Sequence, residues 1–201
     1  MIRKDVVNYA NSLSGEEGHQ EILNIYNSQK VLPRGYKVKY TDAWCATFVS
    51  AVFIQNGYSD IAECSCPKMI EKAKKLGIWK EDDDYIPQIG DIIMYDWQDN
   101  GNGDNIGTPD HVGIVTDINK YITIREGNKG GKIDNRQIFV NSRYIRGYIL
   151  PPYEAEIPKD IHKYQSIEEI IDGIINNEFG SDEETIKNHL FEYFKTIIDN
   201  K

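Results

Sequence analysis

Apolar residues in the first half of the chain recur at helical spacing. Between residues 2 and 30 these apolar positions fall into two groups, separated by Gly15 and Gly18. They are Val6, Val7 and Ala10 in the first group, and Ile22, Leu23, Ile25 and Tyr26 in the second. This spacing predicts one or two helices from Ile2 to about Lys30. A further helix is expected over Ala43–Gln55, capped by Thr41 or Asp42 and ended by Asn56-Gly57, and another over about Pro67–Leu76.

The second half of the chain changes to the pattern of strands. Four short runs rich in β-branched and aromatic residues cover residues 89–95, 111–115, 121–124 and 144–150, with Gly, Asn and Asp clusters between them. Helices followed by strands predict an α+β domain in which the N-terminal helices pack on an antiparallel β-sheet. We expect this domain to cover residues 1–152, with a linker over 153–165 and a small helical unit over 166–201.

Charge and hydropathy narrow the function classes. The net charge of −9 argues against nucleic acid as a partner, because phosphate contacts need clustered Lys and Arg. The longest apolar runs fall short of the roughly 20 residues that a membrane-spanning helix needs, so no membrane partner is expected. The N-terminus lacks the apolar region of a signal peptide. We therefore expect synthesis in the cytoplasm without such a signal.

The three cysteines do not form a disulfide framework. Cys64-Ser65-Cys66 has the wrong spacing for a C-x-x-C redox or zinc pair, so these two are expected to be structural or incidental. The oxygen-rich loop over residues 99–107 lacks the spaced ligands of an EF-hand, and neither a metal nor a cofactor is expected. His19, His162 and His189 have no motif around them and are expected at the surface.

Cys45 has a different context, near the start of a predicted helix. Two or three residues into the helix, its thiol would meet the positive end of the macrodipole and free N–H groups, which favour a thiolate and could bind an oxyanion. His111 opens a predicted strand. On the next strand Glu126 and Asn128 alternate with Gly127, so both should share a face, where either could accept the other ring N–H of His111. Whichever of Glu126 and Asn128 does not bond His111 could orient the substrate or the oxyanion. This order of cysteine, histidine and acid or amide is papain-like.

Four motifs in this order resemble the CHAP domain, the cysteine, histidine-dependent amidohydrolase/peptidase family. They are Trp44-Cys45-Ala46-Thr47-Phe48-Val49, Gly90-Asp91-Ile92-Ile93, Asp110-His111-Val112-Gly113-Ile114-Val115 and Glu126-Gly127-Asn128. The resemblance covers about residues 5–152 and implies a papain-like fold of the CHAP/NlpC type. It also implies Cys45 as nucleophile, His111 as base, and Glu126 and Asn128 as assisting residues. NlpC-type peptidases more typically carry Asp-Cys-Ser and a third His, which favours CHAP.

Two tryptophans are candidates for substrate contacts, Trp44 beside the nucleophile and Trp97 after the first long strand. Each also fits a packing role, since aromatic side chains at such positions commonly complete a core.

The C-terminal segment resembles the short wall-binding repeat of phage lysins, the CW-seven type. Ser166 and Glu169 form a capping box, Phe179-Gly180 stops one helix, and a second apolar helix follows. The chain departs from that family in having Phe179 where Trp is usual and in lacking a Gly-Tyr pair. For so short a unit, the sequence is consistent with two roles. One is binding to the cell wall, and the other is structural packing, which includes self-association of the chain.

Together these features predict a peptidoglycan hydrolase that cleaves an amide or peptide bond of the bacterial cell wall. N-acetylmuramoyl-L-alanine amidase and endopeptidase activities are both open. The absence of a signal and the lysin-like tail suggest an endolysin of a bacteriophage or prophage, which reaches the wall after release by a holin. The rival hypotheses are a Cys-His acyl-transfer enzyme on the same fold and a non-catalytic wall-binding module.

Overall fold

A computed structural model describes residues 1–82, 85–98 and 107–154, together with Glu168, Ile171, Asp172, Phe191 and Lys195. The chain divides into two compact units, Met1–Glu154 and Ala155–Lys201. Nearly all of the predicted linker and C-terminal helical unit lies outside the described residues, as does most of the 99–107 loop. The repeat-like role of that C-terminal unit therefore stays a prediction.

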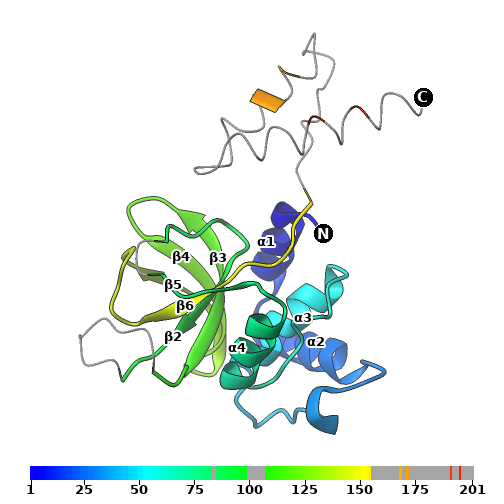
Figure 1. Ribbon diagram of the computed structural model, residues 1–201. Helices are drawn as coiled ribbons and strands as arrows, with labels where there is room; N and C mark the ends of the chain where they lie inside the picture. The colour runs from blue at the N-terminus through cyan, green and yellow to red at the C-terminus, as the bar shows by residue number, and fades with distance from the viewer. Residues whose placement is uncertain are drawn as a thin grey trace. The chain divides into compact units, whose positions relative to one another are not determined.

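Helices come first and strands afterwards in the first unit (Figure 1). The helices are α1 (Arg3–Ser12), α2 (Gly15–Asn27), the 3-10 turn η1 (Pro33–Gly35), α3 (Cys45–Gln55) and α4 (Cys66–Lys75). The strands are β1 (Trp79–Lys80), β2 (Ile92–Tyr95), β3 (His111–Ile118), β4 (Ile122–Lys129), β5 (Lys132–Ile138) and β6 (Ile145–Ile149). No helix among the described residues is long and apolar enough to span a membrane.

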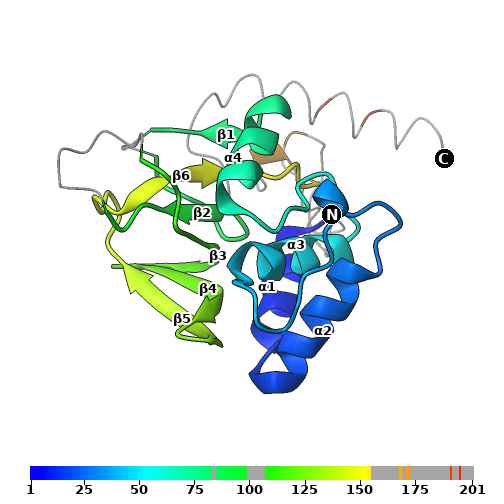
Figure 2. The ribbon, with the colours of Figure 1, turned by 90° about the horizontal axis from the view of Figure 1, so that it is seen from below.

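The strands form one antiparallel sheet in the order β1-β6-β2-β3-β4-β5, and the helices gather on one side of it (Figure 2). This arrangement confirms the predicted α+β class and the packing of N-terminal helices on an antiparallel sheet. Tyr95 pairs with His111 in the register of β2 and β3. The central position of β3 therefore places His111 on a strand that is held from both sides.

Strands β1 and β5 are absent from the sequence prediction. Strand β5 carries mostly polar side chains, and Ile133 is its one buried residue. Edge strands with one solvated face commonly have this composition, and it gives little hydrophobic signal. Strand β1 has only two residues, neither of them fully buried. Both strands are therefore recognised by their pairing and not by their apolar pattern.

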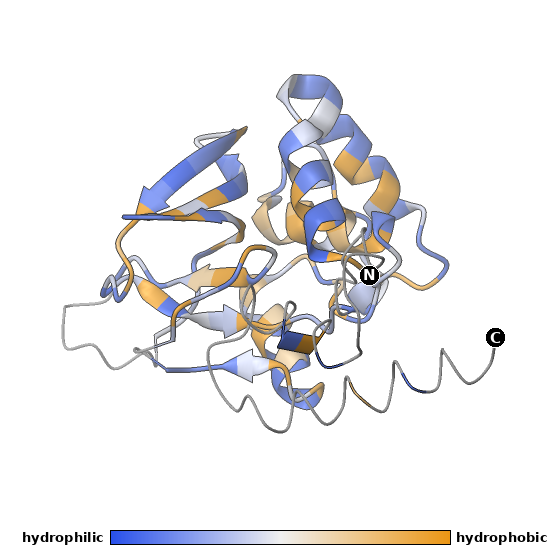
Figure 3. Ribbon diagram, turned by 90° about the horizontal axis from the view of Figure 1, so that it is seen from above, coloured by the Kyte–Doolittle hydropathy of each residue, from blue (hydrophilic) through white to orange (hydrophobic). Residues whose placement is uncertain are grey.

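Helix α3 lies at the centre of the core, in contact with α1, α2, α4, β3 and β4. Every residue from Cys45 to Phe53 is buried, as expected for a helix that is apolar on all faces. Figure 3 shows apolar residues along both the helices and the strands of the sheet. A second apolar cluster, which includes Ile93 and Val115, alternates with the first along β2 and β3 and so lies on the opposite face of the sheet.

Two glycines allow the close approach of the elements that carry the predicted site. A β-carbon on Gly127 would lie 2.4 Å from Cβ of Phe48 and 2.8 Å from the ring of Trp44. A β-carbon on Gly113 would lie 2.9 Å from Cγ of Glu126. Real side chains do not approach this closely, so α3 can lie directly against β4 only where β4 has no side chain.

Asp91 lies just before β2, at the start of the central part of the sheet. Its carboxylate is fully buried and accepts hydrogen bonds from Arg3 at 3.0 Å, from the Tyr85 hydroxyl at 2.6 Å and from the Gln88 backbone N–H at 2.8 Å. Buried charges persist where such partners satisfy them. Asp91 therefore ties α1 to the start of the sheet.

Candidate active site

Cys45 is the first residue of α3, so the helix begins two residues later than the predicted start at Ala43. The N-cap residue is Trp44, and its side chain makes no capping bond. The predicted cap is wrong, because Asp42 instead accepts the Lys39 backbone N–H and the Tyr36 hydroxyl, both at 2.7 Å. At the first helical position the sulfur lies beside backbone N–H groups that have no acceptor within the helix, and the macrodipole favours a negative charge there.

His111 is the first residue of β3, and its ring is hydrogen-bonded to Glu126 on the neighbouring strand β4. Its Nε2 lies 3.1 Å from Oε2 of Glu126, and the other carboxylate oxygen of Glu126 accepts a bond from Nε of Arg136 at 2.7 Å. Glu126 is fully buried. The ring nitrogen Nδ1 of His111 is thus left for Cys45, so the four side chains form a series of alternating charges across β3, β4, β5 and α3.

The ionisation of Cys45 and His111 follows from this series. The hydrogen bond from Cys66, opposed by burial and aided by His111 and the Ala46 N–H, lowers the pKa of Cys45 to about 5. Burial tends to lower the pKa of His111, but its bonds with Cys45 and Glu126 raise it to about 9. Between these values the pair is a thiolate and an imidazolium, the reactive form of a cysteine nucleophile.

Burial strengthens the electrostatic coupling at the site. Cys45 is 7% exposed and His111 is 8% exposed, so water screens their charges only weakly. Burial alone would raise the pKa of the Glu126 carboxyl, yet the hydrogen bonds and charges of His111 and Arg136 hold it below its usual range. Glu126 is therefore an anion that fixes the orientation and tautomer of the His111 ring.

Cys66 also belongs to the site, although the sequence indicates only a structural or incidental role. It is the first residue of α4, and its sulfur lies 3.6 Å from that of Cys45. The pKa of Cys66 is well above its usual value because of the bond to Cys45 and burial. Cys66 therefore keeps its proton where Cys45 loses its own.

Asn128 follows Glu126 on β4 but does not continue the alternation that the sequence suggests. The pairing of β4 with β5 shifts register between Glu126 and Lys129, and Asn128 has a φ of 59° in the left-handed region. Such a bulge breaks the simple two-residue period. Among the described contacts of the site, Glu126 is the partner of His111, and an assisting role for Asn128 stays a prediction.

The two candidate tryptophans differ in exposure. Trp44 is 3% exposed and stacks on His19 at a centroid distance of 4.0 Å, which is a packing role. His19, expected at the surface, is itself buried beneath it. Trp97 is partly exposed and lies under the guanidinium of Arg136 at 4.6 Å. The substrate contacts predicted for Trp44 and Trp97 stay predictions, and the structure favours Trp97.

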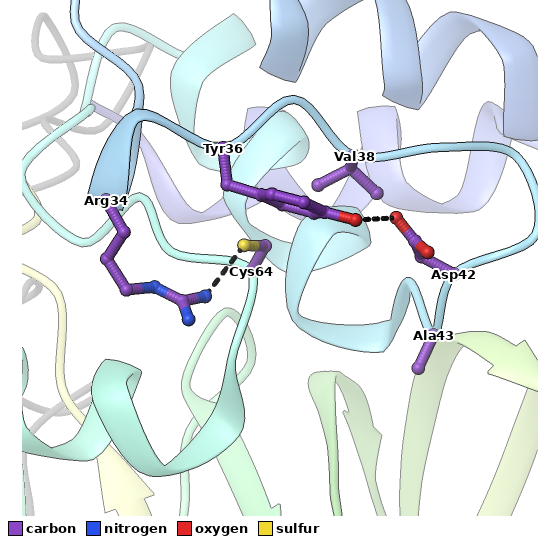
Figure 4. A pocket seen from close by; sticks show the side chains of 6 residues that line it. All are labelled: Arg34, Tyr36, Val38, Asp42, Ala43 and Cys64. Atoms are coloured by element: carbon purple, nitrogen blue, oxygen red, sulfur yellow. Dashed lines mark hydrogen bonds between the residues drawn. The ribbon is translucent and has the colours of Figure 1, made fainter.

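A pocket of about 190 Å³ lies in front of α3, lined by Arg34, Tyr36, Val38, Asp42, Ala43 and Cys64 (Figure 4). Its charged side chains already have partners within the protein. Arg34 donates to Cys64 and Glu63 at 3.0 Å, and Asp42 accepts from Tyr36. These bonds hold the segment before Cys45 against the α3–α4 connection, and so help to fix where α3 begins.

The described residues include no group of three or more His, Cys, Asp or Glu side chains that could hold a metal ion. What the described site offers is a thiolate, an imidazolium oriented by a carboxylate, and N–H groups at a helix start. This set suits nucleophilic attack on a carbonyl carbon followed by proton transfer to a leaving group.

Sequence reasoning missed Arg136 and Cys66. Arg136 belongs to the polar strand β5, and only the pairing of β5 with β4 brings it to Glu126. Cys66 directly precedes the helix predicted from about Pro67, and Cys45 lies near the start of the helix predicted from Ala43. This shared position at a helix start was the available signal that the two thiols could lie close together, since the starts of neighbouring helices can converge on one site.

Residues 35–128 match the family model of the CHAP domain. The matched segment contains Cys45, Cys66, His111 and Glu126, and it ends at Asn128. Arg136 lies beyond it. No curated protein matches the chain. CHAP domains are generally cysteine- and histidine-dependent amidohydrolases or peptidases, and the family implies peptidoglycan as the substrate. With the predicted motifs, the α+β architecture and the family match in agreement, the chain carries a CHAP domain.

Proposed function

We propose that this protein is a peptidoglycan hydrolase that cleaves an amide or peptide bond of the bacterial cell wall through a thiolate at Cys45. The observation that carries the proposal is the buried cluster of Cys45, His111 and Glu126, in which His111 is hydrogen-bonded to Cys45 and its Nε2 lies 3.1 Å from Glu126. A packing or wall-binding role would give no reason to bury this set of charges, whereas an acyl-transfer site requires it.

The chemistry proceeds in two halves. The Cys45 thiolate attacks the carbonyl carbon, and the N–H groups at the start of α3 stabilise the oxyanion. The imidazolium of His111 then donates its proton to the leaving amine as the C–N bond breaks, which leaves an acyl-enzyme on Cys45. In the second half, His111 removes a proton from water, the resulting hydroxide attacks the thioester, and the thiolate leaves. Glu126 holds the ring in place throughout.

The proposal is tested with purified sacculi in water enriched in ¹⁸O. Hydrolysis adds one water for each bond cut, so wild-type enzyme should place ¹⁸O in the new carboxyl group seen by mass spectrometry. Free stem peptides would identify an amidase, and loss of cross-linked fragments would identify an endopeptidase. Products joined to an added amine without ¹⁸O would instead identify an acyl-transfer enzyme.

Cys45→Ala is the matched control, because it removes the sulfur and little volume. The proposal predicts no labelled product above the buffer blank from this variant. Equal product from wild type and Cys45→Ala would reject the nucleophile, and no product from either would reject the hydrolase.

The proposal extends to endolysin-like action, in which enzyme made in the cytoplasm meets the wall only after release. The wall substrate that the CHAP family implies supports this extension. We expect bacteria that express the wild-type chain to keep their turbidity until a membrane-permeabilising agent is added, and then to lyse. Lysis before permeabilisation would contradict this localisation while leaving the hydrolase intact.

A further inference from the structure

The first residues of helices α3 and α4 are neighbours in space. Cys45 is the first residue of α3, Cys66 is the first residue of α4, and their sulfur atoms lie 3.6 Å apart. Both residues are buried, at 7% and 6% exposure. Two thiol sulfurs at this distance share a proton in one hydrogen bond, and the surroundings decide which sulfur is the donor.

The neighbours of the two sulfurs favour opposite ionisation states. Cys45 lies beside the cationic ring of His111 and the backbone N–H of Ala46, both of which stabilise a thiolate. Cys66 lies near the negative charge of Asp110 and has Cys45 itself as a partner. The proton therefore stays on Cys66, which donates its S–H group to the Cys45 thiolate. Burial strengthens this charge-assisted bond, because water cannot compete for the sulfur.

We propose that Cys66 is a positioning residue of the active site, whose S–H group holds the sulfur of Cys45 in place as a thiolate. The inference rests on the proposed role of Cys45 as nucleophile and adds a second donor to it beside His111. The pKa directions of the two thiols, lowered for Cys45 and raised for Cys66, agree with this assignment.

The third cysteine supplies a matched control. Cys64 is two residues from Cys66 but accepts a bond from Arg34 at 3.0 Å, at the pocket in front of α3. Removal of its thiol should leave the bond between Cys45 and Cys66 unchanged. A comparison of the two substitutions therefore separates the loss of one specific donor from the general effect of removing a cysteine.

The experiment measures how fast Cys45 reacts with iodoacetamide as a function of pH, in reduced full-length protein. Cleavage after Glu63, in the denatured and quenched sample, separates Cys45 from Cys64 and Cys66, so mass spectrometry can follow the labelling of Cys45 apart from that of the other two thiols. In wild type the rate should rise through an acid limb near pH 5. In Cys66→Ala we expect the limb to move upward by about one pH unit, as for loss of one bond to an ionised group.

Cys66→Ser keeps a hydroxyl donor and should restore much of the wild-type limb, whereas Cys64→Ala should not move it. Far-ultraviolet circular dichroism verifies that each variant is folded. A wild-type limb near pH 5 that stays unchanged in folded Cys66→Ala would overturn the role of Cys66 alone. A wild-type Cys45 that reacts only near the ordinary thiol pKa would overturn both this inference and the nucleophile assignment. Equal shifts in Cys64→Ala and Cys66→Ala would show a general effect and also overturn the role of Cys66.

Discussion

The helical side and the strand side of the active site are built in different ways. On the helical side, the starts of α3 and α4 bring together two thiols, Cys45 and Cys66. On the strand side, β3, β4 and β5 each contribute one charged group to a ladder, namely His111, Glu126 and Arg136. In the proposed mechanism, the helical side supplies the nucleophile, and the strand side supplies and orients the base.

The two sides differ in how far they depend on long-range structure. A helix start favours a thiolate through its own backbone, and that contribution is set by a few consecutive residues. The strand-side ladder exists only if three strands pair in one register, because each member comes from a different strand. We therefore expect graded losses from substitutions of the supporting strand-side residues Glu126 and Arg136, whereas loss of either reacting group, Cys45 or His111, abolishes the chemistry.

The largest effect is expected from Cys45→Ala and from His111→Ala. Each should reduce wall hydrolysis at least about a thousandfold, because nucleophile and base act as one unit. The measurement is the initial rate of new carboxyl groups released from sacculi. The double variant should be no slower than either single variant, and additive losses would show that the two residues act separately.

Glu126→Gln should come next, with a loss of about a hundredfold. The amide has nearly the same shape but no charge, so His111 loses the anion that stabilises its imidazolium. Since that anion helps to raise the pKa of His111 to about 9, the alkaline limb of the rate should move to lower pH. An alkaline limb that stays in place would show that Glu126 has only a structural role.

Gly127→Ala tests the junction between the two sides. Its β-carbon would lie 2.4 Å from Cβ of Phe48, so α3 must move away from β4. Overpacking of this kind costs about 1–3 kcal/mol in the free energy of unfolding and should also reduce activity about tenfold, because the sulfur moves with α3. Thermal unfolding and hydrolysis rates are the measurements.

Gly130→Ala is the comparison for that substitution, because a β-carbon there would meet no atom within 4 Å, although its φ of +60° strains the backbone. It should lower the melting temperature while leaving the hydrolysis rate near wild type. Equal activity losses in the two variants would contradict a specific role for the α3–β4 contact.

The smallest effect is expected from Arg136→Lys. Lysine keeps the charge beside Glu126 but replaces the planar guanidinium that bonds the carboxylate at 2.7 Å and lies over Trp97. We expect a reduction of about threefold in the hydrolysis rate, since the charge remains and only the geometry is lost. A loss as large as that of Glu126→Gln would mean that Arg136 takes a more direct part in the reaction.

Sequence patterns predicted those parts of the molecule whose signals are local. The apolar run after Cys45 predicts the buried helix α3, and the period of the later strands predicts an antiparallel sheet. The order of Cys45, His111 and Glu126 was enough to predict a cysteine-histidine site. Each of these depends on consecutive residues or on the order of short motifs.

The remaining features depend on contacts that are distant in sequence. Arg136 lies on a polar edge strand whose pattern resembles a loop, and Cys66 meets Cys45 only because two helix starts converge. The bulge at Asn128 interrupts an alternation that the sequence alone makes look regular. No local period carries this information, since it arises from pairing and packing.

The pH dependence of wall hydrolysis by the wild-type chain tests the ion pair most directly. Activity should rise as Cys45 loses its proton near pH 5 and fall as His111 loses its own near pH 9, because the leaving amine then lacks a proton donor. We expect a bell-shaped pH profile of kcat/KM with a broad plateau around neutrality. A rate that stays low at pH 7 and rises only near the pKa of an ordinary thiol, about 8.5, would contradict it.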